Sequence, residues 1–211
     1  MIKVISLNCA GLKAHFSDVQ GDVKIKEADI IRLMETSLEE NDDSTLILPG
    51  HSKHMINVGN GKGIATYFKD GVFSHEQDKT ETYMQVTKFT SIDVDVINVY
   101  RSDKGNSLTL FNYLDSLITL GKPTLITGDF NICFRNHSGN RLSKGLANKG
   151  FIQLVQEATH IRGGHIDHAY WTDAKTTWNQ PQLELYTPYY SDHDALCVTL
   201  VKEDLKLDTP K

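Results

Sequence analysis

The sequence predicts a single-domain α/β protein built in layers. Many short, β-branched, apolar segments are typical of strands, and only a few segments have the apolar spacing of a helix. The chain has 211 residues, 39% of them hydrophobic and 23% charged, which is the size and composition of one globular domain. We therefore expect one domain over residues 1–202 and a polar tail over 203–211.

Strands are expected where β-branched and apolar residues gather between turn residues. These segments span residues 2–8, 29–34, 63–68, 81–88, 91–100, 122–128, 165–171 and 195–201. The sequence contains neither G-x-G-x-x-G nor G-x-x-x-x-G-K-[ST], so a doubly wound nucleotide-binding fold is not indicated. It also lacks the G-x-S-x-G element of serine hydrolases.

One helix is clearly predicted after residue 106. Asn106 or Ser107 is suited to cap its start, and Gly121 and Pro123 end it. Its expected apolar stripe consists of Leu108, Phe111, Leu114, Leu117 and Ile118. Two further helices are expected near residues 14–27 and 143–157.

Cysteine usage and hydropathy bear on the compartment. The three cysteines form no C-x-x-C pair, so neither a disulfide framework nor a cysteine zinc site is predicted. No apolar run approaches the roughly 20 residues that cross a bilayer. The N-terminus alternates like a strand rather than forming a signal sequence. We therefore expect an intracellular protein, in the nucleus or cytoplasm, without a membrane partner.

Charge is unevenly distributed along the chain. The net charge of −5 argues against a partner held by bulk charge alone. However, residues 130–156 contain no acidic residue but include Arg135, Arg141, Lys144 and Lys149. This basic segment is a candidate surface for a nucleic-acid backbone, with an ordinary solvated loop as the alternative.

Polar residues suited to catalysis follow several of the expected strands. They are Asn8, Glu35, Tyr100, Arg101, Asp129, Asn131, Asp167, Asp192 and His193. Any one of them could be a cap or a turn residue. Strand ends at one edge of a sheet converge in space, however, so together they indicate a functional site.

These groups suit the hydrolysis of a phosphate ester, which needs a hard cation, a base for water and donors to the developing charge. Glu35 and Asp192 would supply carboxylate ligands to Mg²⁺. Asp129 would orient or deprotonate water.

The remaining groups would contact the phosphate. Asn8 and Asn131 would donate hydrogen bonds to it, and His193 beside Asp167 would be a fixed, positively biased donor. Tyr100 and Arg101 would hold the scissile or a flanking phosphate.

The same residues resemble the motifs of the endonuclease/exonuclease/phosphatase superfamily, which includes DNase I-like nucleases and AP endonucleases. Residues 8–11 match its Asn-x-x-Gly motif, and residues 28–36 match its metal-ligand motif ending in Glu-Thr. Residues 97–101 match its tyrosine motif. Gly-Asp-Phe-Asn at 128–131, Ile-Asp-His at 166–168 and Ser-Asp-His at 191–193 follow in the family's order.

The resemblance implies a four-layered α/β sandwich, with two mainly antiparallel sheets packed face to face and helices outside. It also implies Mg²⁺, with Mn²⁺ as a substitute, bound at Glu35; Asp192 and Asn8 are the other expected ligands. The implied reaction is in-line hydrolysis that leaves 3′-hydroxyl and 5′-phosphate ends.

Two positions depart from the AP endonuclease pattern. The acid two residues after the first-motif asparagine is Ala10, and the tryptophan often preceding that asparagine is Leu7. Residues 157–168 resemble instead endonuclease domains of non-LTR retrotransposons and Helitron-like elements. The interpretation is therefore a DNA endonuclease, expected to be a monomer and compatible with a domain of a larger polyprotein.

Substrate contacts are expected from Arg101, Arg135, Arg141 and Trp178. The other histidines, His160 among them, are interpreted as surface or turn residues, and His168 is assigned no chemistry. Two alternatives stay open at this point. One is a ribonuclease, deadenylase or phosphatase of the same superfamily, and the other is a non-catalytic binding module.

Overall fold

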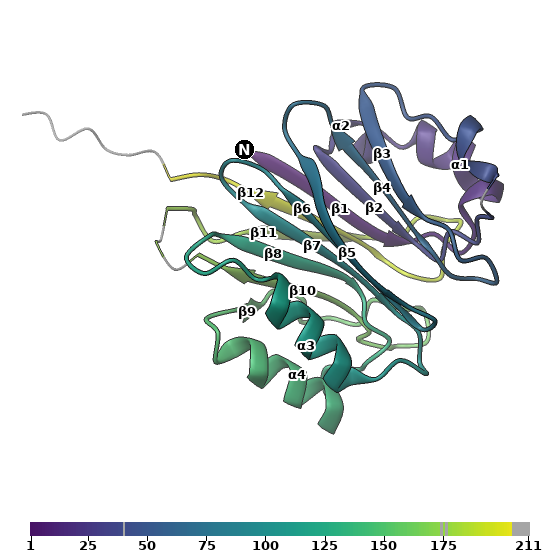
Figure 1. Cartoon of the computed structure of the whole chain (residues 1–211). Helices are drawn as coiled ribbons and strands as arrows, with labels where there is room; N and C mark the ends of the chain where they lie inside the picture. Colours follow the sequence, from purple (N-terminus) through teal and green to yellow (C-terminus); the bar gives the residue numbers. More distant parts are fainter. Residues whose placement is uncertain (40, 174, 176, 204–211) are drawn as a thin grey trace, which may run out of the picture.

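The computed structural model describes residues 1–39, 41–173, 175 and 177–203. Two six-stranded sheets pack face to face, with helices on their outer faces, so the chain forms the expected four-layered α/β sandwich (Figure 1). In the described part of the chain, no helix is long and apolar enough to cross a membrane.

The first sheet has the strand order β11-β12-β1-β2-β4-β3, and only β1 and β2 are parallel within it. Its strands are β1 (Ile2–Asn8), β2 (Ile30–Met34), β3 (His51–Ile56), β4 (Ile64–Lys69), β11 (Gln182–Tyr186) and β12 (Ala195–Leu200).

The second sheet has the order β5-β6-β7-β8-β10-β9, with β7 and β8 as its parallel pair. Its strands are β5 (Ser74–Glu81), β6 (Met84–Thr90), β7 (Asp95–Arg101), β8 (Thr124–Asp129), β9 (Ile152–Gln153) and β10 (Asp167–Thr172). Both sheets are thus mainly antiparallel, as expected.

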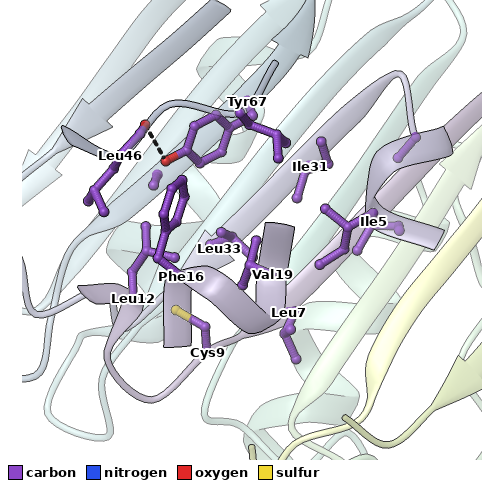
Figure 2. Packing of buried hydrophobic residues seen from close by; sticks show 14 of the residues in the cluster. Ile5, Leu7, Cys9, Leu12, Phe16, Val19, Ile31, Leu33, Leu46 and Tyr67 are labelled. Carbon is purple, nitrogen blue, oxygen red and sulfur yellow. Dashed lines mark hydrogen bonds between the residues drawn. The ribbon is translucent and has the colours of Figure 1, made fainter. Parts of the chain in front are cut away.

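The outer face of the first sheet is covered by α1 (Leu12–Gly21) and α2 (Val23–Glu27), and the short 3₁₀ turn η1 (Asp42–Thr45) follows β2. Phe16 and Val19 of α1 pack into a buried cluster with Ile31 (Figure 2). The expected single helix over 14–27 is wrong, because Asp22 is extended and its carboxylate accepts hydrogen bonds from the amides of Lys24 and Ile25. Asp22 therefore caps a second helix.

The second sheet is covered by α3 (Ser107–Leu117) and α4 (His137–Ala147). The cap at Asn106 is confirmed, because its side chain accepts from the amides of Leu108 and Thr109. The stripe is partly wrong: Leu114 and Leu117 are buried, but Leu108 is 60% exposed.

The helix expected over 143–157 is also wrong. It begins earlier, at His137, and ends at Ala147, before the positive φ of Gly150 and the short strand β9. Four strands were not predicted: β3, β5, β9 and β11. They lie at sheet edges and are only partly buried, so they lack the continuous apolar character used to find the others.

Candidate active site

Strand register brings the predicted site residues to one end of the sandwich. Asn8 ends β1, which pairs in parallel with β2, and Glu35 directly follows β2. In the other sheet Tyr100 of β7 lies opposite Asp129 of β8, and Asp129 lies opposite Asp167 of β10. The convergence expected from the sequence therefore follows from the two parallel pairs and the β8–β10 pairing.

Asp129 is fully buried and held by amide donors. One carboxylate oxygen accepts from Asn8 Nδ2 at 3.0 Å and from Asn131 Nδ2 at 3.2 Å, and the other accepts from the Asn131 backbone N–H at 2.9 Å. Gly128 permits this strand to lie close to β7, since a Cβ there would stand 1.9 Å from the Val99 carbonyl oxygen. The carboxylate is therefore fixed in position.

The protonation of Asp129 is set by its surroundings. Burial raises its pKa, and the nearby charge of Asp167 raises it further, outweighing the effects of His193 and the amide donors. A carboxylate with a raised pKa is a stronger base than one in water.

His193 and Asp167 form a buried pair. His193 Nδ1 lies 2.8 Å from an Asp167 oxygen, which also accepts from the Thr159 hydroxyl at 2.7 Å. Burial lowers the pKa of His193, but the hydrogen bond and charge of Asp167 raise it to about 9 overall. The imidazole is therefore protonated at neutral pH.

The orientation of His193 is fixed from both sides. Its backbone N–H donates to Ser191 Oγ, which itself donates to the Asn8 carbonyl at 2.6 Å. Its Nε2 lies 3.5 Å from Asn8 Nδ2, beside the Asp129 carboxylate. The ring and the Asp129 and Asp167 carboxylates lie within 4.8 Å of one another. A donor and a base thus face the same space.

Glu35 and Tyr100 form a second pair, in which the tyrosine hydroxyl donates to Glu35 Oε1 at 3.1 Å. Burial, the charge of Glu35 and this hydrogen bond all raise the pKa of Tyr100, which stays a donor. Glu35 has a φ of 52°, a left-handed conformation that is rare for glutamate. Its carbonyl oxygen accepts from the Gly11 amide at 2.9 Å, which ties the loop after β1 to the end of β2.

Asp192 is the most exposed of the predicted acids, with 52% of its side chain accessible. One oxygen lies 4.0 Å from His193 Nε2, and the other lies 3.2 Å from Nε2 of His160. His160 was interpreted as a surface residue, but the structure places it edge-to-face against the His193 ring at 4.7 Å. A bridge between residues 160 and 193 brings them together, and no local sequence pattern marks such a contact.

Thr159 is a second residue that sequence reasoning missed. Its hydroxyl donates to the Asp167 carboxylate and accepts from the Asp167 amide at 3.1 Å, eight residues along the chain. The Gly163–Gly164 turn between them was the available signal, since it returns the chain on itself.

Two predicted substrate contacts are not supported. Arg101 is buried, and its guanidinium donates to the backbone carbonyls of Phe130 and Asn131, so it holds the loop after β8. Trp178 is 8% exposed and packs edge-to-face on Trp171, so its ring is not free to stack on a base. Arg135 and Arg141 are exposed in the basic segment, as expected.

His168, to which no chemistry was assigned, is structural. It is fully buried, its ring stacks on Phe130 at 4.5 Å, and Nε2 lies 2.8 Å from the Ile132 carbonyl oxygen. Burial lowers its pKa to about 4, so it is a neutral donor that supports the loop after Asp129.

The donor set fits a hard divalent cation. Three acidic residues, Asp129, Asp167 and Asp192, lie near the one protonated histidine, and Glu35 is linked to the site through Tyr100, which pairs opposite Asp129. In the described part of the chain, no lysine or arginine forms a salt bridge with any of them. Carboxylate and amide oxygens are the ligands that Mg²⁺ takes, and Glu35, Asp192 and Asn8 are the residues expected to hold it.

Comparison with known proteins is consistent with this geometry. The family model described as "Endonuclease/Exonuclease/phosphatase family" matches residues 5–193. No curated protein sequence matches the chain significantly.

Solved structures share the fold at low sequence identity. A 3′ phosphatase from Neisseria, bound to a product DNA hairpin, matches with a TM-score of 0.74 and 16% identity over 94% of this chain and 99% of that one. An AP endonuclease from Archaeoglobus fulgidus matches with a TM-score of 0.70 and 16% identity. The match covers 94% of this chain and 99% of that one. The endonuclease domain of TRAS1, a telomere-specific non-LTR retrotransposon, matches with a TM-score of 0.69 and 13% identity. The match covers 95% of this chain and 98% of that one.

Proposed function

The chain belongs to the endonuclease/exonuclease/phosphatase family, and on that premise we propose that it is a Mg²⁺-dependent endonuclease that hydrolyses DNA phosphodiester bonds. The observation that carries the proposal is the convergence of Asp129, held by two asparagines, with the Asp167–His193 pair. Water attacks the phosphorus in line with the leaving oxygen, and the products carry 3′-hydroxyl and 5′-phosphate ends.

Asp129 is the proposed base. Its oxygens are fixed by Asn8 and Asn131, and its raised pKa favours accepting a proton from water. Because these donors fix the carboxylate before the water binds, little reorganisation is needed during proton transfer. Asn131 keeps this geometry through its own bond to the Arg101 carbonyl at 3.0 Å.

His193 is the proposed donor to the phosphoryl oxygens. With Nδ1 bound to Asp167, the proton on Nε2 points toward the space beside Asp129. A positive donor fixed in a buried site stabilises the charge that develops in the transition state. Asn8 would add a neutral donor, and Tyr100 would act through Glu35, to which its single hydroxyl proton is donated.

Mg²⁺ would be held by Glu35, Asp192 and Asn8, and Mn²⁺ would substitute for it. The bound cation supplies Lewis-acid polarisation of the phosphoryl oxygens. The hydrogen bond from Tyr100 orients the Glu35 carboxylate for this role.

DNA is the proposed substrate because one of the similar structures, the Neisseria 3′ phosphatase, has a product DNA hairpin bound. The acid-free segment 130–156 follows Asp129 directly and exposes Arg135 and Arg141. It would lie along the sugar-phosphate backbone. We extend the proposal to a monomeric, intracellular nicking domain of a mobile element, since the TRAS1 domain is similar across nearly the whole chain.

Reversing the charge of Arg135 and Arg141 tests the basic segment. The logarithm of the DNA-binding constant falls linearly with the logarithm of the salt concentration, and each phosphate contact contributes about 0.9 to this salt slope. R135E/R141E should therefore lower the slope by roughly 1.8 and weaken DNA binding. Binding would be measured by fluorescence anisotropy over a salt series. K26E, a reversal on exposed Lys26 of α2, is the matched control. An unchanged slope in the double variant would reject this surface.

The substrate is tested with duplex DNA and RNA oligonucleotides of one sequence, incubated with Mg²⁺ or Mn²⁺ and analysed for their end groups. We expect DNA cleavage with 3′ ends that a polymerase extends. Cleavage of RNA alone would favour the ribonuclease alternative. Release of inorganic phosphate without strand cleavage would favour the phosphatase alternative.

A further inference from the structure

A second histidine–carboxylate cluster lies away from the candidate active site. It consists of His54 on β3 and of His75 and Asp78 on β5. Each of these strands is the last strand of its sheet, so the cluster joins the open edges of the two sheets on one side of the sandwich (Figure 1).

The three side chains share one centre. Nε2 of His54 lies 2.9 Å from Asp78 Oδ2, and Nε2 of His75 lies 2.9 Å from Asp78 Oδ1. All three ligand atoms lie within 4.8 Å of one another. Two imidazole nitrogens therefore face both oxygens of a single carboxylate.

An irregularity in β5 creates this arrangement. Residues three apart on a regular strand point to opposite faces, so His75 and Asp78 would ordinarily diverge. The pairing register with β6 shifts between His75 and Gln77, and the inserted residue returns Asp78 to the face of His75. Glu76 bonds instead to Lys88. Bulges commonly redirect side chains in this way.

The imidazole rings are held before any ligand binds. His54 and His75 stack at 3.8 Å between ring centroids, and both contact the buried ring of Phe89 edge-on, at 6.0 and 5.4 Å. The side chains stay accessible, at 26% for His54, 31% for His75 and 29% for Asp78. The cluster is thus ordered on its inner side and open to solvent on its outer side.

We propose that this cluster binds a divalent transition-metal ion of the Zn²⁺ type. The ligands would be Nε2 of His54, Nε2 of His75 and the Asp78 carboxylate, with solvent completing a tetrahedron. Bond lengths of about 2.0–2.1 Å place tetrahedral ligands about 3.3 Å apart, so the 2.9 Å contacts need only a small outward movement. Such an ion would link the edges of the two sheets.

The donor type separates this site from the proposed Mg²⁺ site. Imidazole nitrogen suits Zn²⁺, Ni²⁺, Cu²⁺ and Co²⁺, whereas Mg²⁺ takes oxygen ligands. His160, Asp192 and His193 also lie within 4.8 Å of one another, so the active site could compete for Zn²⁺. The test therefore has to distinguish the two clusters by substitution.

The experiment titrates the metal-free protein with Zn²⁺ by calorimetry and with Co²⁺ by visible absorption, and measures Tm. Wild type should bind one Zn²⁺ at the edge cluster, and its Tm should rise by about 5–10 °C at 100 times the Kd. H75A and D78N should weaken this binding by at least about 100-fold, since loss of an outer partner alone costs 10–100-fold. H54Q, which keeps a polar side chain, should also lose Zn²⁺ binding at the edge cluster.

Two control variants keep the edge cluster intact. H160A alters the active-site cluster, and H51A removes a histidine that instead contacts the Ala28 carbonyl. Both should retain the Zn²⁺ affinity and the rise in Tm. Circular dichroism establishes that each variant is folded. Absence of Zn²⁺ binding by wild type, or equal affinity in wild type, H75A and H54Q, would overturn the proposal. Neither result depends on nuclease activity.

Discussion

Two buried polar regions lie between the sheets, and they are satisfied very differently. At the active-site end, the carboxylates of Asp129 and Asp167 each accept several hydrogen bonds. Further along the same interface, Arg32 of β2 is fully buried. Its Nη1 donates to Thr127 Oγ1 and to the Ile97 carbonyl, both at 2.8 Å.

The surroundings of Arg32 supply few further partners. In the described part of the chain, Nε and Nη2 of Arg32 have no hydrogen-bond partner. The same holds there for the Oδ1 and Nδ2 atoms of Asn98 and for the hydroxyls of Thr66 and Thr87. Burial holds the pKa of Arg32 well below its usual value. Buried water is the usual partner of such groups, so we expect ordered water in this layer.

The difference teaches what buried polarity does in each place. At the active-site end, a complete network fixes a base and a donor against each other, as catalysis requires. Around Arg32, the described residues supply only two hydrogen bonds to a fully buried charge, and the desolvation of that charge costs folding free energy. The predictions below separate the two regions, the first by activity and the second by stability.

Removing the base should have the largest effect. D129N keeps the shape of the side chain but cannot accept a proton, so cleavage should fall by at least about 10³-fold. Because both carboxylate oxygens accept hydrogen bonds, the amide NH₂ of D129N faces at least one of these donors, so Tm should fall by a few degrees. Single-turnover cleavage and thermal unfolding measure both effects. Retained activity in folded D129N would refute the role of Asp129 as the base.

His193 should have the next largest effect. H193Q keeps a hydrogen-bonding group but not the positive charge, so cleavage should fall by about 10²–10⁴-fold. The wild-type rate should decline as the pH rises through about 9, where the imidazole loses its proton. A pH–rate profile from pH 6 to 10 measures this. A profile identical in wild type and H193Q would contradict the assignment.

Arg32 should affect stability rather than chemistry. R32A leaves both a cavity and unpaired acceptors, at a cost of about 3 kcal/mol in the free energy of unfolding. R32M fills the space and removes a poorly compensated charge, so it should cost at least about 2 kcal/mol less. Urea unfolding distinguishes the two variants. Equal losses would mean that the guanidinium is better satisfied than its contacts indicate.

The last effect concerns pH and stability. The pKa of His193 is about 9 in the folded protein and 6.5 ordinarily, so its protonation stabilises the fold fully below pH 6.5. This contribution, about 3 kcal/mol or about 6–12 °C in Tm, is lost as the pH rises through 9. H193Q should show a flatter dependence of Tm on pH. Parallel curves would indicate that the pair contributes nothing to stability.

The same contrast explains what the sequence could predict. Asn8, Asp129 and His193 could be found because each stands beside an apolar strand in a spaced motif. The burial of Arg32 could not be predicted, because a charged residue within an apolar strand usually faces solvent. The helix expected over 143–157 failed because an apolar stripe does not reveal the turn at Gly150.

Long-range contacts mark a second limit. The edge strands β3 and β5 carry polar residues, so no apolar alternation marked them. His160 contacts His193 through a pairing across the fold, which only the assembled sheets show. Thr159 reaches Asp167 through the local Gly163–Gly164 turn, a signal that was present in the sequence. Whether residues 1–202 fold alone as the whole domain stays a prediction.

The central proposal, metal-dependent DNA cleavage at this site, is tested most directly by the nicking of supercoiled plasmid. Wild type, H193A and the control H51A would be compared with Mg²⁺ and with EDTA. We expect nicking by wild type and H51A with Mg²⁺ only, and none by H193A. A folded wild-type protein that leaves the plasmid intact, or equal nicking by H193A, would contradict the proposed function.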